Sequence, residues 1–466
     1  MKRVIHWFRR DLRLHDNTAL AEACRQAEQV IPVFILEDAL RSGPDVGAAR
    51  LQFLFNSAAE LRDNLQALGS KLIVRTGKSE FEIPRLAKEL KAQAVFCNVR
   101  YEPYAQKRDG RVFNALNEIG VGFESFKDAV IWHEHEILTQ AEKPFTVFTP
   151  YSKAWKKRKV PPPHGKANPA RIKALDGVPS ENLPSDSAHF GFPCAQTFLP
   201  AGEAAGRKQL QHFLRSKIFD YADARNRADT EGTSMLSAHL RAGTIGIRTV
   251  LAKLSAARTE GTAVEQSSCD VFQNELTWRE FYLQVLHHFP HVMHGAFRPE
   301  YNALAWSDNE KDFRAWCDGQ TGYPIIDAAM RCLNTTGWMH NRLRMIVAMF
   351  LTKDLLINWQ CGERYFMQQL VDGDMAANNG GWQWSAGTGT DAAPYFRIFN
   401  PTSQALKCDP KGTFVRRWIP ELANVPDISI HESWKEPQLA TKYPKRIVLH
   451  EEQRVKALAM FKQVKC

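Results

Sequence analysis

The chain has 466 residues, of which 44% are hydrophobic and 24% charged, a composition that excludes a disordered or fibrous protein and, at this length, predicts two domains. Its formal net charge of +10 is typical of a protein that meets a polyanion. There is no apolar leader and no run of about 18 apolar residues, and the nine cysteines include no CxxC pair, so we expect a cytoplasmic protein with reduced thiols that enters no membrane.

Residues 1–130 alternate short apolar runs with segments of helical spacing. The apolar runs predict buried strands at "RVIHWF" (3–8), "VIPVFIL" (30–36), "KLIVR" (71–75) and "AVFCNV" (94–99). The segments that follow them predict helices at 17–28, 47–69, 79–91 and 103–119. This alternation predicts an α/β domain with a doubly wound parallel sheet. Ligands bind at the carboxyl ends of such strands, although neither a GxGxxG nor a P-loop motif is present.

The rest of the chain differs from the first 130 residues in composition and in the spacing of its apolar residues. Proline and small polar residues crowd 160–200, which indicates a connection over a surface. Beyond it the spacing predicts only helices, at 206–218, 246–257, 269–289, 323–333, 340–357 and 361–371. We therefore expect an α/β domain at 1–130, an interdomain linker at 131–204 and an all-α domain at 205–466.

The helix at 269–289 carries a stripe of aromatic and charged side chains on one face, formed by Phe272, Glu275, Trp278, Arg279 and Tyr282. One interpretation is a ligand site, because rings stack on flat ligands and polar groups bind their edges. The alternative is a Glu275–Arg279 salt bridge flanked by core aromatics, and the helix alone favours this alternative.

In the helix at 340–357, Asn341, Arg344 and Met345 share a face away from the apolar stripe. An arginine in such apolar surroundings needs a partner, since an unpaired buried charge is costly. Asp372 and Asp374, just downstream, are the expected partners.

Two histidine-rich segments invite a metal. One holds His287, His288, His291 and His294, and the other, "WHEHE", holds His133 and His135. Neither has the spacing of a zinc motif, so we expect no metal site. The basic run "KAWKKRK" at 153–159 is typical of a solvated face, with contact to phosphates as the alternative.

Five stretches in order along the chain resemble the photolyase/cryptochrome family: "WFRRDLRLHDN", "EGTSMLSAHLRAG" (231–243), "NELTWREFY" (274–282), "TGYPIIDAAMRCLNTTGWMHNRLRMI" (321–346) and "NNGGWQWSAGTGTDAAPYFRIFNP" (378–401). The likeness is strongest to the class I cyclobutane pyrimidine dimer photolyases. It implies an N-terminal α/β domain and a helical domain that holds FAD. It also implies a monomer whose excited, reduced flavin gives an electron to a pyrimidine dimer flipped out of DNA.

The resemblance implies a set of FAD-binding residues: Tyr221, Thr233, Ser234, Met235, Leu236, Ser237, Phe272, Arg279, Arg344, Asp372, Gly373, Asp374 and Asn378. Asn378 matches the position that faces flavin N5. A neutral amide there stabilises the reduced anion, whereas a carboxylic acid supplies a proton. Asn378 therefore favours DNA repair over a cryptochrome-type blue-light photoreceptor, which is the main alternative. A nucleotide-binding adaptor that uses only the N-terminal sheet is a third reading, and it leaves the second half of the chain unexplained.

The family's electron relay from the flavin to the surface matches Trp382, Trp359 and Trp306. Trp278 and Trp384 match residues that line the dimer cavity, where Glu275 meets the pyrimidine edge. The resemblance also places Asn341 and Met345 in the cavity and phosphate contacts at Arg225, Arg342 and Arg397. Asn341 and Met345 stand where (6-4) photolyases have histidines, which favours cyclobutane dimers as the substrate. The glycines at 380, 381, 387 and 389 are expected to form a turn.

A second, light-harvesting chromophore stays open at this point. Folate-binding relatives line an N-terminal pocket with a histidine and an Asn-Glu pair, and the matching stretches here read "RSGPDVGAAR" and "RYEPYAQKRD". Those stretches put a folate in doubt and leave a deazaflavin, another flavin or no antenna as alternatives.

Overall fold

A parallel sheet lies at the centre of the N-terminal unit in the computed structural model, which describes residues 1–43, 45–173, 175, 177–193 and 199–464. Its five strands run in the order β3-β2-β1-β4-β5: β1 (Arg3–Phe8), β2 (Gln29–Leu36), β3 (Ile73–Thr76), β4 (Ala94–Asn98) and β5 (Gly122–Phe126). The four predicted strands are confirmed to within two residues at each end. The edge strand β5 was missed because its residues are exposed or half-buried and form no continuous apolar run.

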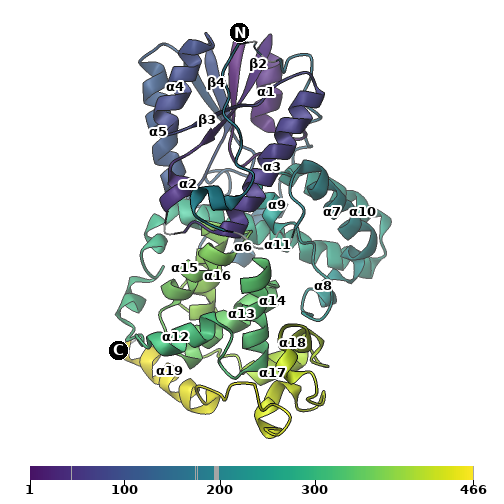
Figure 1. The fold of residues 1–466 in the computed structure, drawn as a ribbon, viewed down its shortest axis with the longest axis vertical. Coiled ribbons are helices and arrows are strands. Elements are labelled where there is room, and N and C mark those ends of the chain that lie inside the picture. Colours follow the sequence, from purple (N-terminus) through teal and green to yellow (C-terminus); the bar gives the residue numbers. More distant parts are fainter. Residues whose placement is uncertain (44, 174, 176, 194–198, 465–466) are drawn as a thin grey trace.

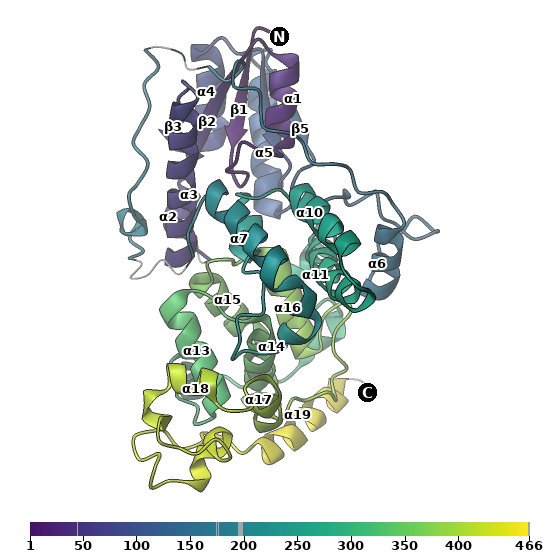
Figure 2. The same ribbon diagram turned by 90° about the vertical axis from the view of Figure 1, so that its right-hand side faces the viewer.

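Helices cover both faces of this sheet (Figures 1 and 2). Val4 and Phe8 of β1 pack into one apolar core, while Ile5 and Trp7 pack into another, so successive side chains face opposite layers. This arrangement confirms the doubly wound α/β unit. The helices are α1 (Thr18–Gln26), α2 (Ala39–Ser42), α3 (Ala48–Ala67), α4 (Ser79–Glu89) and α5 (Pro103–Asn117).

The rest of the described chain is helical, as predicted (Figure 1). The predicted linker at 131–204, called the connection below, contains the helix α6 (Phe148–Lys156), which was not predicted. The basic run at 153–159 therefore lies mostly on a helix. The positions of the domain boundaries, at 130 and 204, stay a prediction. The helical unit consists of α7 (Glu203–Ser216), α8 (Tyr221–Ala224), α9 (Ser237–Ala242), α10 (Ile247–Glu260), α11 (Ala263–His288), α12 (Glu310–Cys317), α13 (Pro324–Thr336), α14 (Asn341–Met349), α15 (Trp359–Gln369), α16 (Met375–Ala386), α17 (Pro401–Cys408), α18 (Thr413–Trp418) and α19 (His450–Val464).

The helix α16 corrects the expected glycine turn. Gly380 and Gly381 lie inside this helix, which begins where the Asp374 side chain accepts a hydrogen bond from the Ala377 N–H at 3.3 Å. Gly380 is needed because a Cβ there would lie 2.2 Å from the Tyr282 ring. Gly387, with φ of 82°, ends the helix in the left-handed conformation, so the turn is confirmed only from that residue onward.

Buried ion pairs join the two units at a seam formed by Arg13, Asp16, Asp128 and Arg248. Asp128 accepts hydrogen bonds from Arg13 at 2.7 Å and from Arg248 of α10 at 2.7 Å. Arg248 also pairs with Asp16 at 2.8 Å. The side chains of all four residues are at most 5% exposed. The two arginines hold the pKa of Asp128 well below its usual range despite the burial that opposes them.

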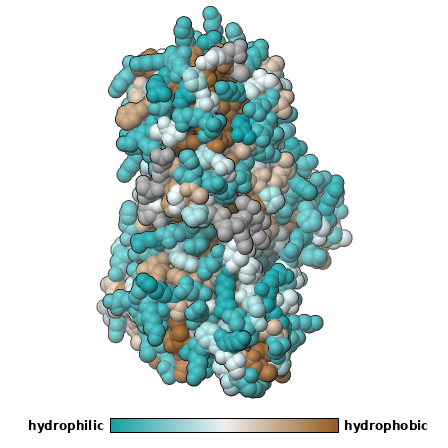
Figure 3. All heavy atoms as spheres, in the orientation of Figure 1, coloured by the Kyte–Doolittle hydropathy of each residue, from teal (hydrophilic) through white to brown (hydrophobic). Residues whose placement is uncertain are grey.

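Hydrophilic residues dominate the face shown in Figure 3, and the apolar residues on it occur in small separate groups. Within the described part of the chain, no helix combines the length and the apolar character that crossing a membrane requires.

Candidate active site

A charged cluster joins α8, α11 and α14 at one side of the site. Glu275 of α11 pairs with Arg225 at 2.8 Å. Arg342 of α14 donates to the side chain of Asn226 and lies 3.9 Å from the Met345 sulfur. The structure therefore brings together Arg225, Glu275, Arg342 and Met345, which the sequence spreads over 120 positions.

The partner of Glu275 corrects one sequence interpretation. Glu275 does not pair with Arg279, whose Nη1 donates instead to the Ala129 carbonyl oxygen at 2.7 Å. Burial raises the pKa of Glu275, although the Arg225 charge acts in the opposite direction. The two charged side chains of the α11 stripe thus do not pair with each other, and Glu275 instead reaches Arg225 at the end of α8.

Aromatic rings form the neighbouring wall. The Trp278 ring stacks on Phe148 of α6, with 3.7 Å between centroids and 9° between planes, so one face of Trp278 is covered by protein. Asp391 accepts a hydrogen bond from the Phe148 N–H at 2.9 Å, which fixes the loop after α16 against α6. Sequence reasoning missed Phe148, since nothing in the predicted linker at 131–204 distinguishes it.

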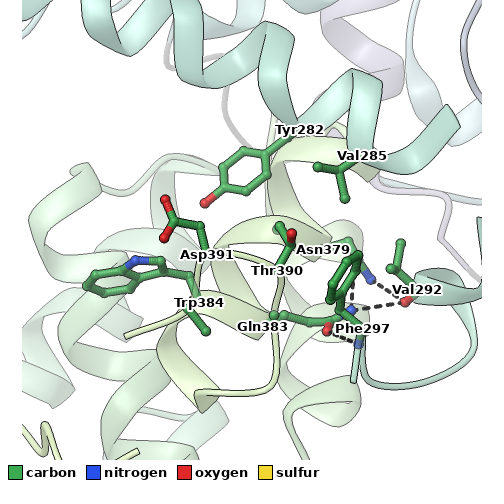
Figure 4. Close-up of a pocket in the computed structure, with 12 residues that line it drawn as sticks. Tyr282, Val285, Val292, Phe297, Asn379, Gln383, Trp384, Thr390 and Asp391 are labelled. Carbon is green, nitrogen blue, oxygen red and sulfur yellow. Dashed lines mark hydrogen bonds between the residues drawn. The ribbon is translucent and has the colours of Figure 1, made fainter. Parts of the chain in front are cut away.

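Trp384 of α16 lies across a small pocket from Tyr282 of α11, with Asp391 close to both (Figure 4). Gln383 closes the far side of this pocket, because its side chain accepts from the Phe297 N–H at 2.8 Å and donates to the carbonyl oxygens of Val292 and Gly295. The indole of Trp384 is half-buried and forms one wall of the opening.

A second group of polar side chains lies between α14 and α16. Arg344 pairs with Asp372 at 2.9 Å, which confirms one of its two expected partners. The amide nitrogen of Asn378 donates to the Glu363 carbonyl oxygen at 2.9 Å, which fixes the orientation of this amide. Three residues further along α16, a Cβ at Gly381 would meet no heavy atom within 4 Å. There is therefore open space beside Gly381, on the same side of α16 as Asn378.

The predicted phosphate-binding segment forms a tight bend before α9. Met235 has φ of 55°, a conformation that costs a non-glycine residue free energy and that is concentrated at functional sites. Ser234 is fixed by Gln209, which donates to its carbonyl oxygen at 3.0 Å, while Ser237 is exposed. Thr233 is half-buried and Leu236 is 1% exposed, so the bend offers hydroxyls above an apolar anchor.

Four predicted residues lie at the edges of this arrangement. Phe272 is buried against Phe213 and Tyr221, with 4.7 and 5.2 Å between ring centroids. Asn341 and Arg397 are exposed. The carbonyl oxygen of Gly373 accepts from Arg241, 3.1 Å away.

The three predicted relay tryptophans follow a gradient of burial. Trp382 and Trp359 are 2% and 3% exposed, and Trp306 is half-buried. Trp382 packs on Gly362 of α15, the helix that begins at Trp359. The Ser307 N–H donates to the Leu356 carbonyl oxygen at 2.7 Å, which holds the Trp306 segment beside the start of α15. Two of the predicted relay tryptophans are therefore buried and the third is partly accessible.

Four arginines gather where the carboxyl edge of the sheet meets the helical unit. Glu102 pairs with both Arg10, after β1, and Arg100, after β4. Arg50 of α3 and Arg241 of α9 instead donate to backbone carbonyl oxygens at Leu370 and Gly373. Burial and the Arg10 charge lower the pKa of Arg50 and of Arg100 to about 10. Sequence reasoning noted this sheet edge as a ligand position but did not identify the arginines.

Comparisons with known proteins place the chain among flavin-dependent repair enzymes. Residues 4–170 match the family model described as DNA photolyase, and residues 272–463 match the FAD binding domain of DNA photolyase. A deoxyribodipyrimidine photo-lyase from Synechococcus sp. is 41% identical over 99% of this chain and 97% of its own length.

Two solved structures extend this likeness to the fold. A bacterial class III photolyase from Agrobacterium tumefaciens superposes with a TM-score of 0.92 at 36% identity, covering 100% of this chain and 98% of its own. An archaeal photolyase from Sulfolobus tokodaii, described as containing two FAD molecules, gives 0.86 at 34% identity, covering 99% and 100%. The narrower assignment to class I stays a prediction.

Proposed function

Because this chain belongs to the DNA photolyase family, we propose that it is a deoxyribodipyrimidine photo-lyase, which uses blue light to split cyclobutane pyrimidine dimers in DNA. The observation that carries the proposal is the contact of Glu275 with Arg225, close to Arg342 and one helical turn from the stacked Trp278. A carboxylate, guanidinium groups and a flat ring are what a flipped-out pyrimidine dimer and its flanking phosphates require. A monomeric protein that acts in the cytoplasm is part of the same proposal.

The residues between α14 and α16 fit the flavin of FAD. The Arg344–Asp372 pair and the oriented Asn378 amide surround an open side of α16, and polar groups that converge on a flat space suit a fused heterocycle. The strained bend at Met235 presents hydroxyls of the type that bind phosphate. When bound, FAD supplies the electron that opens the cyclobutane ring after the reduced flavin absorbs light.

The chain's own groups prepare the DNA lesion for that electron. Trp278 has one ring face against Phe148, which fixes its position, and the ring is only half-buried, so part of it stays accessible for contact with a pyrimidine. Burial raises the pKa of Glu275, and we expect its carboxyl group to form a hydrogen bond with the edge of a pyrimidine. Arg225 and Arg342 neutralise backbone phosphates beside the lesion.

We also propose that the four arginines at the sheet edge bind the anionic part of a second chromophore. Positive charge concentrated at Arg10, Arg50, Arg100 and Arg241 is offset directly only by Glu102 among the ion pairs that the structure describes. Arginine binds phosphate in a bidentate geometry, so a flavin nucleotide fits this edge, and the sequence stretches that lack the folate-binding residues point the same way. The test is the flavin content of purified protein. Two equivalents of flavin in the wild type and one in Arg50→Ala would support this proposal, and one equivalent in both proteins would contradict it.

The enzyme proposal is tested by direct repair. The flavin of the purified protein is reduced and the protein is mixed with DNA that carries one thymine dimer, and intact dimer is measured with and without blue light. Light-dependent loss of the dimer is expected, and Trp278→Ala should weaken lesion binding, because each base–aromatic stack contributes about 1–3 kcal/mol. If dimers persist although FAD is bound, a blue-light receptor becomes the better assignment.

A further inference from the structure

A cluster of potential metal ligands lies at the junction of the two units, away from the proposed active site. Glu134 and His135 belong to the connection after the sheet, and His287 lies in the last turn of α11. One ligand atom from each residue lies within 4.8 Å of the other two. Sequence reasoning considered the two histidine-rich segments separately and expected no metal in either, because they lie about 150 residues apart and only the fold brings them together.

From this geometry we propose that Glu134, His135 and His287, named here the junction cluster, bind one divalent transition-metal ion such as Zn²⁺. Two imidazoles and a carboxylate form a ligand set that Zn²⁺ uses with three protein ligands and one open position for water. Around a common ion, with bonds of about 2.0–2.2 Å, such ligands lie roughly 3.3 Å apart. Nε2 of His287 and Oε1 of Glu134 are 3.7 Å apart, close to this spacing, and the ligand atom of His135 lies within 4.8 Å of both residues.

Neighbouring groups already hold these ligands in place. Nδ1 of His287 lies 3.2 Å from the side-chain amide of Gln106 on α5, and rotation of that amide turns its oxygen into the acceptor for an Nδ1–H. The second oxygen of Glu134 lies 3.3 Å from Nδ1 of His133. His288 contacts the Glu134 carbonyl oxygen at 2.9 Å, which anchors the backbone of the connection to α11. Supporting contacts of this kind orient metal-binding histidines.

The consequence of binding is mechanical. A metal ion in the junction cluster would join Glu134 and His135 of the connection to the end of α11, the helix that carries Glu275 and Trp278. Gln106 of the sheet unit already contacts His287 at this end of α11. The site is open to solvent, since the side chains of His287 and Glu134 are 22% and 17% exposed and His135 is exposed. An ion can therefore enter the folded protein.

The test uses full-length protein without an affinity tag, stripped of metals by a chelator and titrated with Co²⁺. Visible absorption of Co²⁺ reports nitrogen and oxygen ligation, and Zn²⁺ then displaces it. We expect saturation at one equivalent, an affinity at least tenfold lower in His135→Ala and in His287→Ala, and an unchanged affinity in His294→Ala, which removes an exposed histidine outside the cluster.

A second readout separates binding from folding. Zn²⁺ should raise the thermal unfolding midpoint of the wild-type protein but not that of His135→Ala, because ligands that bind only the folded state stabilise it. His135 is exposed, so its replacement leaves the packing intact even if His287→Ala folds poorly. Absence of saturable Co²⁺ binding in the wild type, or equal binding in wild type and His135→Ala, would overturn the proposal.

Discussion

Replacing Gly380 or Gly381 by alanine separates two sides of the helix that carries Trp382 and Trp384. Alanine in place of glycine stabilises a helix interior by roughly 0.5–1 kcal/mol in both variants. At Gly380, however, the new Cβ would lie 2.2, 2.3 and 2.7 Å from three atoms of the Tyr282 ring, which has to move away. Overpacking of this kind costs about 1–3 kcal/mol. Because the helix gain is common to both, Gly380→Ala should be less stable than Gly381→Ala by about 1–3 kcal/mol.

The assay compares thermal unfolding midpoints of the two variants in flavin-free protein, together with their FAD affinities. Gly381→Ala should unfold at a higher temperature than wild type without FAD, since its Cβ meets nothing within 4 Å. The same methyl group would occupy space beside the proposed flavin position, so FAD binding should weaken. Equal midpoints for the two variants would refute the packing argument. An unchanged FAD affinity in Gly381→Ala would show that the cofactor does not bind on this side of α16.

Four further outcomes are expected. Trp306→Phe should stop photoreduction of the flavin by an external reductant while chemically reduced protein still repairs dimers, and equal photoreduction would remove Trp306 from the relay. Asn378→Asp should let the photoreduced flavin take up a proton, visible in its absorption spectrum; an unchanged spectrum would contradict the role of the amide. Arg342→Ala should lower the salt slope of lesion binding by about one, and the wild-type slope would mean that no phosphate is contacted. Burial lowers the pKa of Lys353 from 10.5 to about 7, so between pH 7 and pH 10.5 the folded protein binds fewer protons than the unfolded chain. The stability of the wild type should therefore rise with pH in this range, whereas that of Lys353→Met should not.

Continuous apolar runs made the inner strands of the sheet predictable, because strands buried on both faces leave this signature in one short segment. The α16 helix was missed for the opposite reason. Glycines at 380 and 381 predict a turn, and only the Tyr282 ring from α11, about 100 residues earlier, makes a glycine necessary inside the helix. Tertiary packing of this kind has no local sequence signal.

In the candidate site too, contacts with a local sequence signal were predictable and contacts between distant segments were not. The Arg344–Asp372 pair was predictable, since a charge in an apolar helix requires a partner and few carboxylates lie nearby. The Glu275–Arg279 pair was wrong because a helical spacing of four residues permits a contact without enforcing it, and Arg225 of α8 reaches the carboxylate. Phe148 and the four sheet-edge arginines come from segments that meet only in the folded chain.

The seam of Arg13, Asp16, Asp128 and Arg248 has a consequence for light harvesting. Each carboxylate is shared between partners through directional hydrogen bonds, so a slide of one unit along the other by a single bond length would strand a charge where water cannot reach it. Breaking such a pair costs about 3–5 kcal/mol. A second chromophore bound at the sheet unit, as proposed, would thus be held by this seam at one separation and angle relative to the FAD of the helical unit.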